Sequence, residues 1–286
     1  MKAVSLFAKN TVWSFEVFPP KPNVPINSIY QTLAALKGLQ PDFISVTYGA
    51  GGSAPGASTA EICRTIQQEH GIPAIAHLPY INETKASVLE KLAQFRAFGI
   101  ENILALRGDR NPAVPPQEDF RYACDLIRFI RENSADGEFD IAAACYPEAH
   151  PEAPDLDTDI LHLREKVEAG ATHLISQLFY RNSDFYRFCE KTAKAGIHVP
   201  IEAGIMPVTS KKSIERMVSL CGASIPSRLA RLMARYADDP ASLKAAGLEY
   251  AIDQILDLRA NGVSGIHLYT MNNPDVAHYI TEACAE

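Results

Sequence analysis

Short runs of mainly apolar residues alternate along the chain with longer stretches in which apolar residues recur at helical spacing. The short runs are rich in Val, Ile, Ala and Phe and show little polar alternation, which is typical of parallel strands covered by helices. These runs predict eight strands: Val12–Val17, Phe43–Thr47, Ala74–Leu78, Asn102–Leu106, Asp140–Cys145, His173–Leu178, Pro200–Ile205 and Gly265–Tyr269.

Two of the intervening stretches, Thr84–Phe98 and Phe120–Asn133, show the helical pattern most clearly. In the first, the residues that fall on one face are Val88, Leu89, Leu92, Phe95 and Phe98. In the second, they are Ala123, Cys124, Ile127 and Ile130. Each stretch therefore predicts an amphipathic helix that packs against the strands.

Eight strands alternating with helices over 286 residues predict an α/β protein with a (β/α)₈ fold, the TIM barrel. The interval Lys211–Asn261, before the last strand, is longer than the others and holds enough sequence for two or three extra helices. Pro226 and Pro240 can each begin or break a helix there. Because no linker or low-complexity segment interrupts the pattern, residues 1–286 are expected to form a single catalytic domain.

A doubly wound sheet is the competing fold. Gly49–Ala54 follows the second predicted strand and matches the dinucleotide fingerprint G-x-G-x-x-A. That fingerprint needs a loop that leads directly into a helix, with an acidic residue about twenty positions later at the next strand. Pro55 and Gly56 interrupt the loop here, and Glu69 falls within the following helix. The barrel is therefore the favoured prediction.

Composition narrows the class of protein. Apolar residues make up 47% of the chain and the formal net charge is −7, so we expect a large core and no nucleic-acid partner. The N-terminal apolar stretch is too short for a signal peptide and no segment is long enough to span a membrane, which predicts a cytoplasmic location. Six widely spaced cysteines without a C-x-x-C pair predict neither a zinc site nor a disulfide framework.

Polar residues stand at or just beyond the ends of all eight predicted strands. In a barrel of this class the carboxyl ends of the strands form the functional face, so these side chains are expected to converge. They are Glu16, Thr47, Tyr48, His77, Arg107, Asp109, Tyr146, Glu148, His150, Gln177, Glu202 and Tyr269. The set predicts a polar pocket with few cations, suited to a ligand that is recognised by hydrogen bonds.

Glu16 is expected to point into the barrel. Period-two alternation places it on the same face as Ser14, opposite Phe15 and Val17, which suit the side that faces the helices. Two interpretations stay open. Apolar neighbours would favour the protonated carboxyl and make Glu16 a general acid near neutrality, whereas a position on the rim would pair it with a lysine or an arginine.

The segments after the fourth and fifth strands are rich in ionisable groups. Arg107–Asp109 suits either a turn capped by its aspartate or a ligand site whose glycine lets the backbone approach closely. Cys145–Glu152 lacks zinc motifs, so no metal is expected unless His77 and His150 converge with a carboxylate; otherwise His150 stacks on or hydrogen-bonds a ligand. The other histidines are interpreted as structural or surface residues: His70, His162, His173, His198, His267 and His278.

Several segments together resemble the methylenetetrahydrofolate reductase family, in its bacterial form without the regulatory domain of the eukaryotic enzymes. They follow in order over nearly the whole chain: Phe15–Lys21, Val46–Ala50, Ala105–Asp109, Tyr146–Pro151, Gln177–Tyr180, Pro207–Val208 and Leu268–Asn272. The resemblance implies a flavin-containing (β/α)₈ barrel that reduces 5,10-methylenetetrahydrofolate to 5-methyltetrahydrofolate. It also implies NADH or NADPH as reductant, ping-pong kinetics, and a place in one-carbon metabolism and methionine biosynthesis.

The resemblance further implies roles for individual residues. Glu16 matches the general acid that helps open the imidazolidine ring of the folate, and Asp109 matches a carboxylate close to the flavin and the pterin. FAD is the expected flavin and FMN the alternative. The matching flavin positions are Thr47, Tyr48, Ala50, His77, Arg107, Gly108, Asp109, Ala123, Tyr146, His150, Asp159 and Lys166. The matching folate positions are Glu16, Asp109, Gln177 and Tyr269, and Gln177 also matches a residue that serves the nicotinamide nucleotide.

Three positions depart from the family's pattern. Asn273 stands where some relatives place an arginine that binds folate, Ser213 where a folate-contacting glutamine can occur, and Glu165 where flavin binding can use a basic residue. Two other functions stay open: a flavin-free, pterin-dependent methyltransferase barrel, and a subunit of a one-carbon complex that takes electrons from a redox partner. A homo-oligomer is also expected, because members of the family form oligomers.

Overall fold

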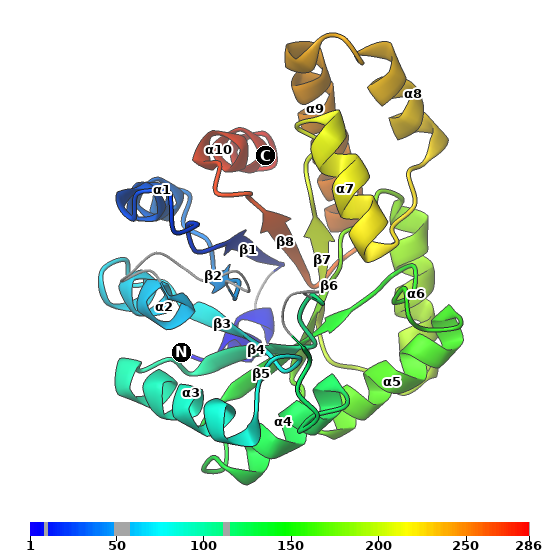
Figure 1. The fold of residues 1–286 in the computed structure, drawn as a ribbon. Helices are drawn as coiled ribbons and strands as arrows, with labels where there is room; N and C mark the ends of the chain where they lie inside the picture. Colours follow the sequence, from blue (N-terminus) through cyan, green and yellow to red (C-terminus); the bar gives the residue numbers. More distant parts are fainter. Residues whose placement is uncertain (9–10, 49–57, 111–114, 286) are drawn as a thin grey trace.

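The computed structural model describes residues 1–8, 11–48, 58–110 and 115–285, and at its centre eight parallel strands close into a barrel (Figure 1). The strands are β1 (Val12–Val17), β2 (Phe43–Val46), β3 (Ala74–Pro79), β4 (Asn102–Leu106), β5 (Asp140–Cys145), β6 (His173–Ser176), β7 (Ile201–Ile205) and β8 (Gly265–Tyr269). Each pairs with its neighbours in sequence, and β1 pairs with β8. The predicted (β/α)₈ fold is confirmed, with every predicted strand present.

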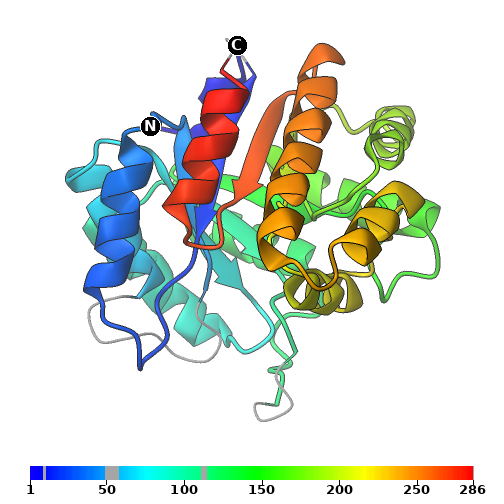
Figure 2. The same cartoon turned by 90° about the horizontal axis from the view of Figure 1, so that it is seen from above.

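Helices surround the barrel. The described residues form the 3₁₀ helix η1 (Ala3–Ala8) and the α-helices α1 (Asn27–Lys37), α2 (Thr59–Gln68), α3 (Lys85–Phe98), α4 (Ala123–Glu132), α5 (Leu156–Glu168), α6 (Asn182–Lys194), α7 (Lys211–Cys221), α8 (Ser227–Arg235), α9 (Pro240–Ala260) and α10 (Pro274–Ala283). Helix α10 lies between α1 and α9, so the first and last parts of the chain are neighbours in the outer layer (Figure 2).

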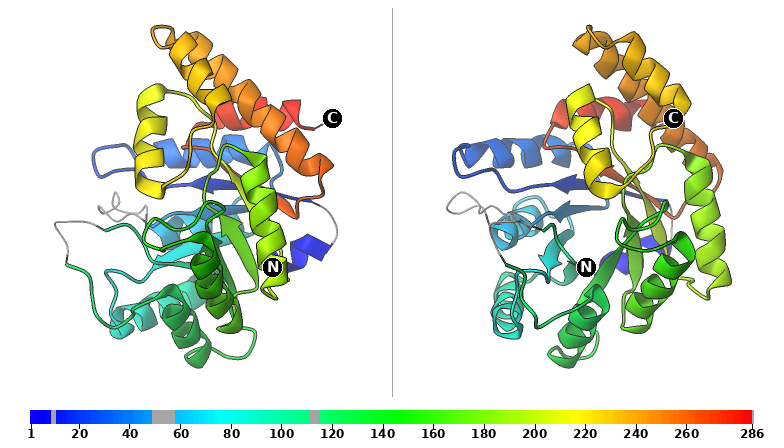
Figure 3. Two further views of the ribbon diagram at one scale, coloured as in Figure 1. Left: turned by 90° about the vertical axis from the view of Figure 1, so that its right-hand side faces the viewer. Right: turned by 45° about the vertical axis from the view of Figure 1, so that its right-hand side comes forward.

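The interval before β8 holds three helices, α7, α8 and α9, as predicted (Figure 3). Pro226 is the N-cap of α8 and Pro240 is the first residue of α9, where a missing N–H group costs no helical hydrogen bond. Apolar residues of these helices form a separate small core that includes Leu229 and Leu243 and packs on Met206, just after β7. The extra helices therefore build up the wall of the barrel beside its carboxyl end.

The outward face of the strands forms the main core with the helices. Phe15 and Val17 are completely buried there, as the alternation in β1 predicts. The prediction for Leu89 is wrong: it is 41% exposed, whereas Val88 and Leu92 are buried. Successive helical residues lie roughly 100° apart, so Leu89 falls at the edge of the buried stripe rather than within it.

The amino-terminal end of the barrel is closed by η1. Backbone N–H groups of its first two residues donate to side-chain oxygens of Asn102 and Asp140, both at 2.8 Å. The ring centroids of Phe7 and His173 lie 5.3 Å apart. Because this end is covered, the carboxyl ends of the strands are the open face.

The structure also bears on the expectations about membrane helices, cysteines and the competing fold. Within the described ranges, no helix has both the length and the apolar character needed to cross a membrane. The six cysteines are free thiols. The loop Gly49–Ala54, which resembles a dinucleotide fingerprint, lies outside the described residues, but the closed barrel rules out the doubly wound sheet.

Candidate active site

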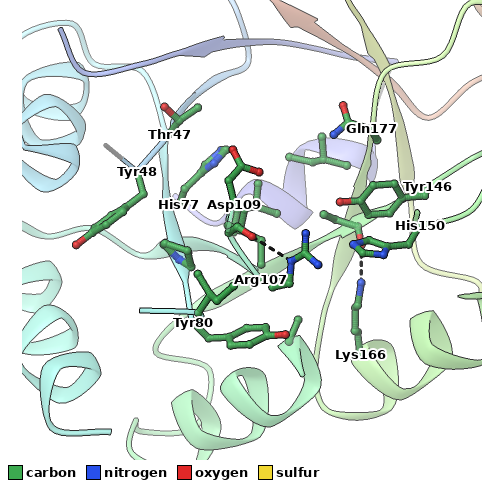
Figure 4. Close-up of a pocket in the computed structure, with 18 of the residues that line it drawn as sticks. Thr47, Tyr48, His77, Tyr80, Arg107, Asp109, Tyr146, His150, Lys166 and Gln177 are labelled. Atoms are coloured by element: carbon green, nitrogen blue, oxygen red, sulfur yellow. Dashed lines mark hydrogen bonds between the residues drawn. The ribbon is translucent and has the colours of Figure 1, made fainter. Parts of the chain in front are cut away.

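A cavity of about 720 Å³ opens at the carboxyl ends of the strands (Figure 4). This volume is typical of cofactor and substrate sites. Apart from Ala50, which lies outside the described residues, every residue that the family resemblance assigns to the site lines it: Glu16, Thr47, Tyr48, His77, Arg107, Gly108, Asp109, Ala123, Tyr146, His150, Asp159, Lys166, Gln177 and Tyr269. The structure thus brings these side chains together, while their individual roles stay predictions.

Glu16 faces two histidines. Its side chain is 20% exposed, and its Oε2 lies 3.5 Å from Nε2 of His77 and 3.7 Å from Nε2 of His267. The structure corrects both interpretations of its surroundings, because imidazoles, rather than apolar side chains or a lysine or arginine, are the neighbours of this carboxylate. An imidazole can donate or accept a proton, so this arrangement would allow proton transfer to or from Glu16.

Both histidines are buried inside the barrel, His77 on β3 and His267 on β8. Burial lowers the pKa of His77 to about 4, against the opposing effect of Glu16, so its imidazole is neutral near pH 7. From the sequence, His267 is interpreted as a structural or surface residue, and its contact with Glu16 is not predicted. A signal was present, because His267 precedes Tyr269 by two residues and both therefore lie on one face of β8.

The structure gives no support to a shared metal site at His77 and His150. Among the described side chains, no three His, Cys, Asp or Glu residues are placed to hold a metal ion. His77 faces Glu16, whereas the ring of His150 lies edge-on to Tyr146 with centroids 4.8 Å apart. His150 therefore belongs to an aromatic part of the cavity wall.

Two acidic residues predicted at strand ends do not line the cavity. Glu202 is the second residue of β7 and is 0% exposed, and its Oε1 accepts a hydrogen bond from Ser14 at 2.8 Å. An inward residue near the start of a barrel strand lies in a lower layer of the interior, which the strand-end argument ignored. Glu148 instead accepts a hydrogen bond from the backbone N–H of Ser224.

A carboxylate bridges the loops that follow β4 and β5. Glu152 Oε1 lies 2.7 Å from Nη1 of Arg107 and 3.2 Å from Nε of Arg110. The side chain of Glu152 is 52% exposed, so water weakens both ion pairs. An anionic ligand that binds Arg107 through Nη1 has to displace Glu152 first.

Gly108 shapes the turn after β4. Its φ of +88° lies in the left-handed region that favours glycine, and a Cβ at this position would lie 2.7 Å from Cβ of Pro79. The turn presents Arg107 and Asp109 on the cavity wall, with Asp109 exposed to solvent. The triplet therefore lines the cavity, and its role as a ligand site stays a prediction.

The wall formed by β5 and α5 combines aromatic, acidic and basic groups. The backbone N–H of His150 donates to Oδ2 of Asp159 at 2.9 Å. Nζ of Lys166 donates to the carbonyl oxygen of Ala144 at 2.9 Å (Figure 4). Burial raises the pKa of Tyr146 to about 12, which keeps its hydroxyl protonated, and burial also lowers the pKa of Lys166. This wall therefore contains an amine, at Lys166, and a neutral hydroxyl donor, at Tyr146.

Next to this wall, Gln177 and Tyr269 are held by backbone groups. Oε1 of Gln177 accepts from the N–H of Leu178 at 2.8 Å, and the hydroxyl of Tyr269 donates to the carbonyl oxygen of Ser176 at 2.7 Å. A Cβ at Gly204 would lie 2.8 Å from that hydroxyl, so the glycine makes room for the ring. Burial raises the pKa of Tyr269 well above its ordinary value, and the phenol stays neutral.

Part of the cavity wall comes from residues that were not predicted from the sequence. Further lining residues are Tyr80, Glu83, Leu104, Leu106, Tyr122, His162, Ile175, Met206 and Met217. Tyr80 directly follows β3, so the strand-end argument could have found it. The rings of Tyr122 and His162 stack with centroids 6.2 Å apart, but they come from the helical layer, where no strand end points to them.

The three departures from the family pattern have different surroundings. Asn273 is the N-cap of α10 and accepts a hydrogen bond from the backbone N–H of Val276, and the N–H of Ser213 donates to the hydroxyl of Ser210, the N-cap of α7. Glu165 alone among the three lines the cavity. The departures at 273 and 213 are thus used locally to begin or continue helices.

Comparison with known proteins agrees with the resemblance. The family model described as "Methylenetetrahydrofolate reductase" matches residues 2–285. The 5,10-methylenetetrahydrofolate reductases of Pectobacterium carotovorum and Escherichia coli K12 are 33% and 34% identical to this chain, over 93% of it and 88% of each relative. Methylenetetrahydrofolate reductase (NADH) 1 of Arabidopsis thaliana is 34% identical over 92% of this chain and 46% of its own length.

Two solved structures share the fold. An uncharacterized protein from Clostridium thermocellum that binds two copies of 5-methyl-5,6,7,8-tetrahydrofolic acid aligns with a TM-score of 0.63 and 16% identity, over 98% of this chain and 96% of that one. The lyase of 2,3-dimethylmalate aligns with a TM-score of 0.55 and 12% identity, over 99% and 84%. These likenesses show the fold alone. The family match over nearly the whole length, together with the identity to curated relatives, shows that the chain belongs to the methylenetetrahydrofolate reductase family of oxidoreductases.

Proposed function

We propose that this chain reduces 5,10-methylenetetrahydrofolate to 5-methyltetrahydrofolate, with NADH or NADPH as the hydride source and a bound flavin as the carrier. One observation carries the proposal: in a chain of this family, every described residue expected to hold flavin or folate lines a single cavity. In this proposal residues 1–286 act as one catalytic domain, and the reaction takes place at the carboxyl face of the barrel.

The residues of the cavity fit a flavin. Leu104, Leu106 and Ile175 offer apolar surface for an isoalloxazine ring, and Arg107 and Lys166 offer cations for phosphate groups. We propose FAD, and FMN, which carries the same ring, is the alternative. When bound, the flavin supplies the hydride chemistry between nicotinamide and folate, and the protein supplies binding, orientation and electrostatics.

Glu16 supplies the proton in this proposal. Protonation of a nitrogen in the imidazolidine ring opens that ring to an iminium, which is the form that accepts hydride. A general acid has to reach the proton acceptor directly. Glu16 is accessible from the cavity, whereas the two imidazoles beside it, His77 and His267, are buried. Because His77 is neutral, it can hydrogen-bond this carboxyl group without adding a charge that would stabilise the carboxylate.

Asp109 and Gln177 have complementary roles. The negative charge of Asp109 stabilises the cationic iminium and disfavours additional negative charge in the cavity. The side-chain oxygen of Gln177 is occupied by the N–H of Leu178, so its NH₂ group is the end that donates to folate or nicotinamide. Tyr269, anchored by its hydroxyl, provides a fixed aromatic face beside them.

The proposal is tested by an absorbance spectrum of the purified chain, followed by anaerobic addition of NADH or NADPH and then of 5,10-methylenetetrahydrofolate. Flavin bands should bleach with at least one nucleotide and return with the folate, and chromatography of the released cofactor distinguishes FAD from FMN. A colourless chain that neither flavin reconstitutes would contradict the proposal and favour the methyltransferase. Bands that stay oxidised with both nucleotides would favour a redox partner as electron donor.

A further inference from the structure

A chain of buried polar groups runs beneath Glu16 in the barrel interior. Ser14 Oγ lies 2.7 Å from Nδ1 of His267 and 2.8 Å from Oε1 of Glu202. On the other side of the imidazole, Nε2 of His267 lies 3.3 Å from Oγ of Ser45 and 3.7 Å from Oε2 of Glu16. Ser14, His267 and Glu202 are each 0% exposed, so the end of this chain that reaches the cavity is Glu16.

The barrel makes room for the carboxyl group of Glu202. Gly265 pairs with Glu202 across β7 and β8, and a Cβ at that glycine would lie 2.7 Å from Cγ of Glu202. Oε2 of Glu202 has no hydrogen-bond partner among the described residues. Burial raises the pKa of Glu202 to about 7, with His267 and Ser14 opposing the shift and Asp42 adding to it. This carboxyl group can therefore hold a proton near neutral pH.

The hydrogen bonds allow one proton two locations. With Glu202 protonated, its O–H donates to Ser14, Ser14 donates to Nδ1 of His267, and the Nε2–H of His267 faces the carboxylate of Glu16. With Glu202 ionised, each bond reverses: Nδ1–H donates to Ser14, Ser14 donates to Glu202, and Nε2 faces a protonated Glu16. In both arrangements each donor of the chain points at an acceptor.

We propose, on the basis of the proposed function, that His267, Ser14 and Glu202 are positioning residues that store a proton and return it to Glu16. After Glu16 has protonated the folate, the O–H proton of Glu202 moves to Ser14, the proton of Ser14 moves to Nδ1 of His267, and the Nε2 proton moves to Glu16. Glu202 ends as a carboxylate and Glu16 as a carboxylic acid, while Ser14 and His267 end neutral. The reverse sequence reloads Glu202 when solvent protonates Glu16 in the open cavity.

The surrounding titratable groups leave this path intact. His77 on β3 and His173 on β6 are neutral near pH 7, because burial lowers the pKa of each to about 4. Tyr269 keeps its proton, and Asp42 donates nothing because its carboxylate accepts from the backbone N–H of Trp13. The 3.7 Å distance from Nε2 of His267 to Oε2 of Glu16 is longer than a hydrogen bond, and Oγ of Ser45 lies nearer to this nitrogen, at 3.3 Å. The proposed transfer therefore requires the contact with Glu16 to shorten when substrate binds, as catalytic hydrogen bonds often do.

The first test uses Glu202→Gln, which keeps the shape of the side chain and removes its titration. The rates of both half-reactions are measured anaerobically between about pH 5 and 9. In the pH–rate profile of the folate half-reaction, we expect the alkaline limb to shift to lower pH by about one pH unit or more. At a fixed pH on that limb, this shift is about a tenfold loss of rate. Flavin reduction by the nicotinamide should be unchanged. A folate profile that superimposes on that of the unaltered chain would overturn the proposal.

A second set of variants separates proton transfer from packing. His267→Gln should slow the folate half-reaction by on the order of a hundredfold, and adding Glu202→Gln should slow it no further, because both residues act in series. His173→Gln is the matched control, since His173 is also 0% exposed inside the barrel but is not in contact with Glu16. It should leave the pH profile unchanged. Additive losses in the double variant would contradict a single path.

A third readout does not depend on turnover. In the flavin-free chain, imidazole ¹⁵N chemical shifts should show that His267 changes tautomer as Glu202 titrates. In Glu202→Gln, His267 should keep one tautomer at every pH. A tautomer that ignores both pH and the substitution would contradict the proposal. Failure of the proposed function itself looks different: the unaltered chain would then fail to transfer hydride to the folate at every pH.

Discussion

The two sides of the cavity are built in different ways. On one side Glu16, His77 and His267 project from strands β1, β3 and β8, and the imidazoles are buried. On the other side Arg107 and Glu152 meet across two loops, where their ion pair is partly exposed. Strands hold the carboxylate and the imidazoles in fixed geometry and low dielectric, whereas loops hold ion pairs that a ligand can exchange at little cost. Substitutions on the strand side should therefore change rates, and those on the loop side should change affinities.

The largest effect is expected from Glu16→Gln on the strand side. Glutamine keeps the size of the side chain but cannot donate the proton, so the folate half-reaction should slow by about 10²- to 10⁴-fold. Flavin reduction by the nicotinamide requires no proton from this residue and should be nearly unchanged. Stopped-flow absorbance of each half-reaction measures the two rates separately. Equal losses in both would remove the contrast between proton chemistry and ligand binding.

The second-largest effect is expected on stability at low pH, through His77 on the strand side. The pKa of His77 is about 4 in the folded chain, below its ordinary value of 6.5, so the unfolded chain takes up the proton first as pH falls. The contribution of His77 to the free energy of unfolding is fully present above about pH 6.5. It is lost as the pH falls towards 4, at up to about 1.4 kcal/mol per pH unit. Denaturant unfolding at several pH values should show a shallower dependence for His77→Gln. His278→Gln, at an exposed histidine of α10, should leave the dependence unchanged.

Gly108→Ala tests the turn after β4, which belongs to the loop side. Its positive φ and the 2.7 Å approach to Pro79 should together cost about 1–3 kcal/mol, measured by thermal or denaturant unfolding. Because the turn also presents Arg107 and Asp109, flavin content after purification should fall. Gly99→Ala is the control: it has a φ of +68° with no atom within 4 Å of the added Cβ. If both variants lost the same stability and kept their flavin, the turn would have no special role.

The smallest effect is expected from Glu152→Gln on the loop side. The substitution frees Arg107 from a partly exposed ion pair of about 1 kcal/mol or less, so the flavin should bind up to about fivefold more tightly. Titration of the flavin-free chain measures the dissociation constant. Glu168→Gln, which breaks the pair of Glu168 with Arg164 on α5, is a control outside the cavity. Weaker flavin binding in Glu152→Gln would show that Glu152 holds the ligand rather than competing with it.

The strands and the functional face were predictable because each depends on local pattern. Buried parallel strands appear as apolar runs, and all eight were found with small differences at their ends. The polar residues beyond those runs had to meet because the barrel closes, so Thr47, Gln177 and Tyr269 could be assigned to one cavity from the sequence.

The contacts inside the barrel were not predictable in the same way. Whether His267 reaches Glu16, and whether Glu202 lies in the cavity or beneath it, depends on the stagger between β7, β8 and β1, which closure of the barrel sets. The pairing of Gly265 with Glu202 joins positions whose spacing in the sequence carries no periodic signal. The ion pair of Arg107 with Glu152 likewise depends on two loops whose relative placement only the fold determines.

The central claim is that one cavity joins hydride chemistry to a proton from Glu16. The most direct measurement is a single anaerobic turnover, in which one equivalent of 5,10-methylenetetrahydrofolate is added to the chain after reduction by the nicotinamide nucleotide. The account predicts that oxidised flavin absorbance returns and that one 5-methyltetrahydrofolate forms per flavin, in the unaltered chain but not within the same time in Glu16→Gln. A flavin that stays reduced in the unaltered chain, or a variant that turns over equally fast, would contradict it.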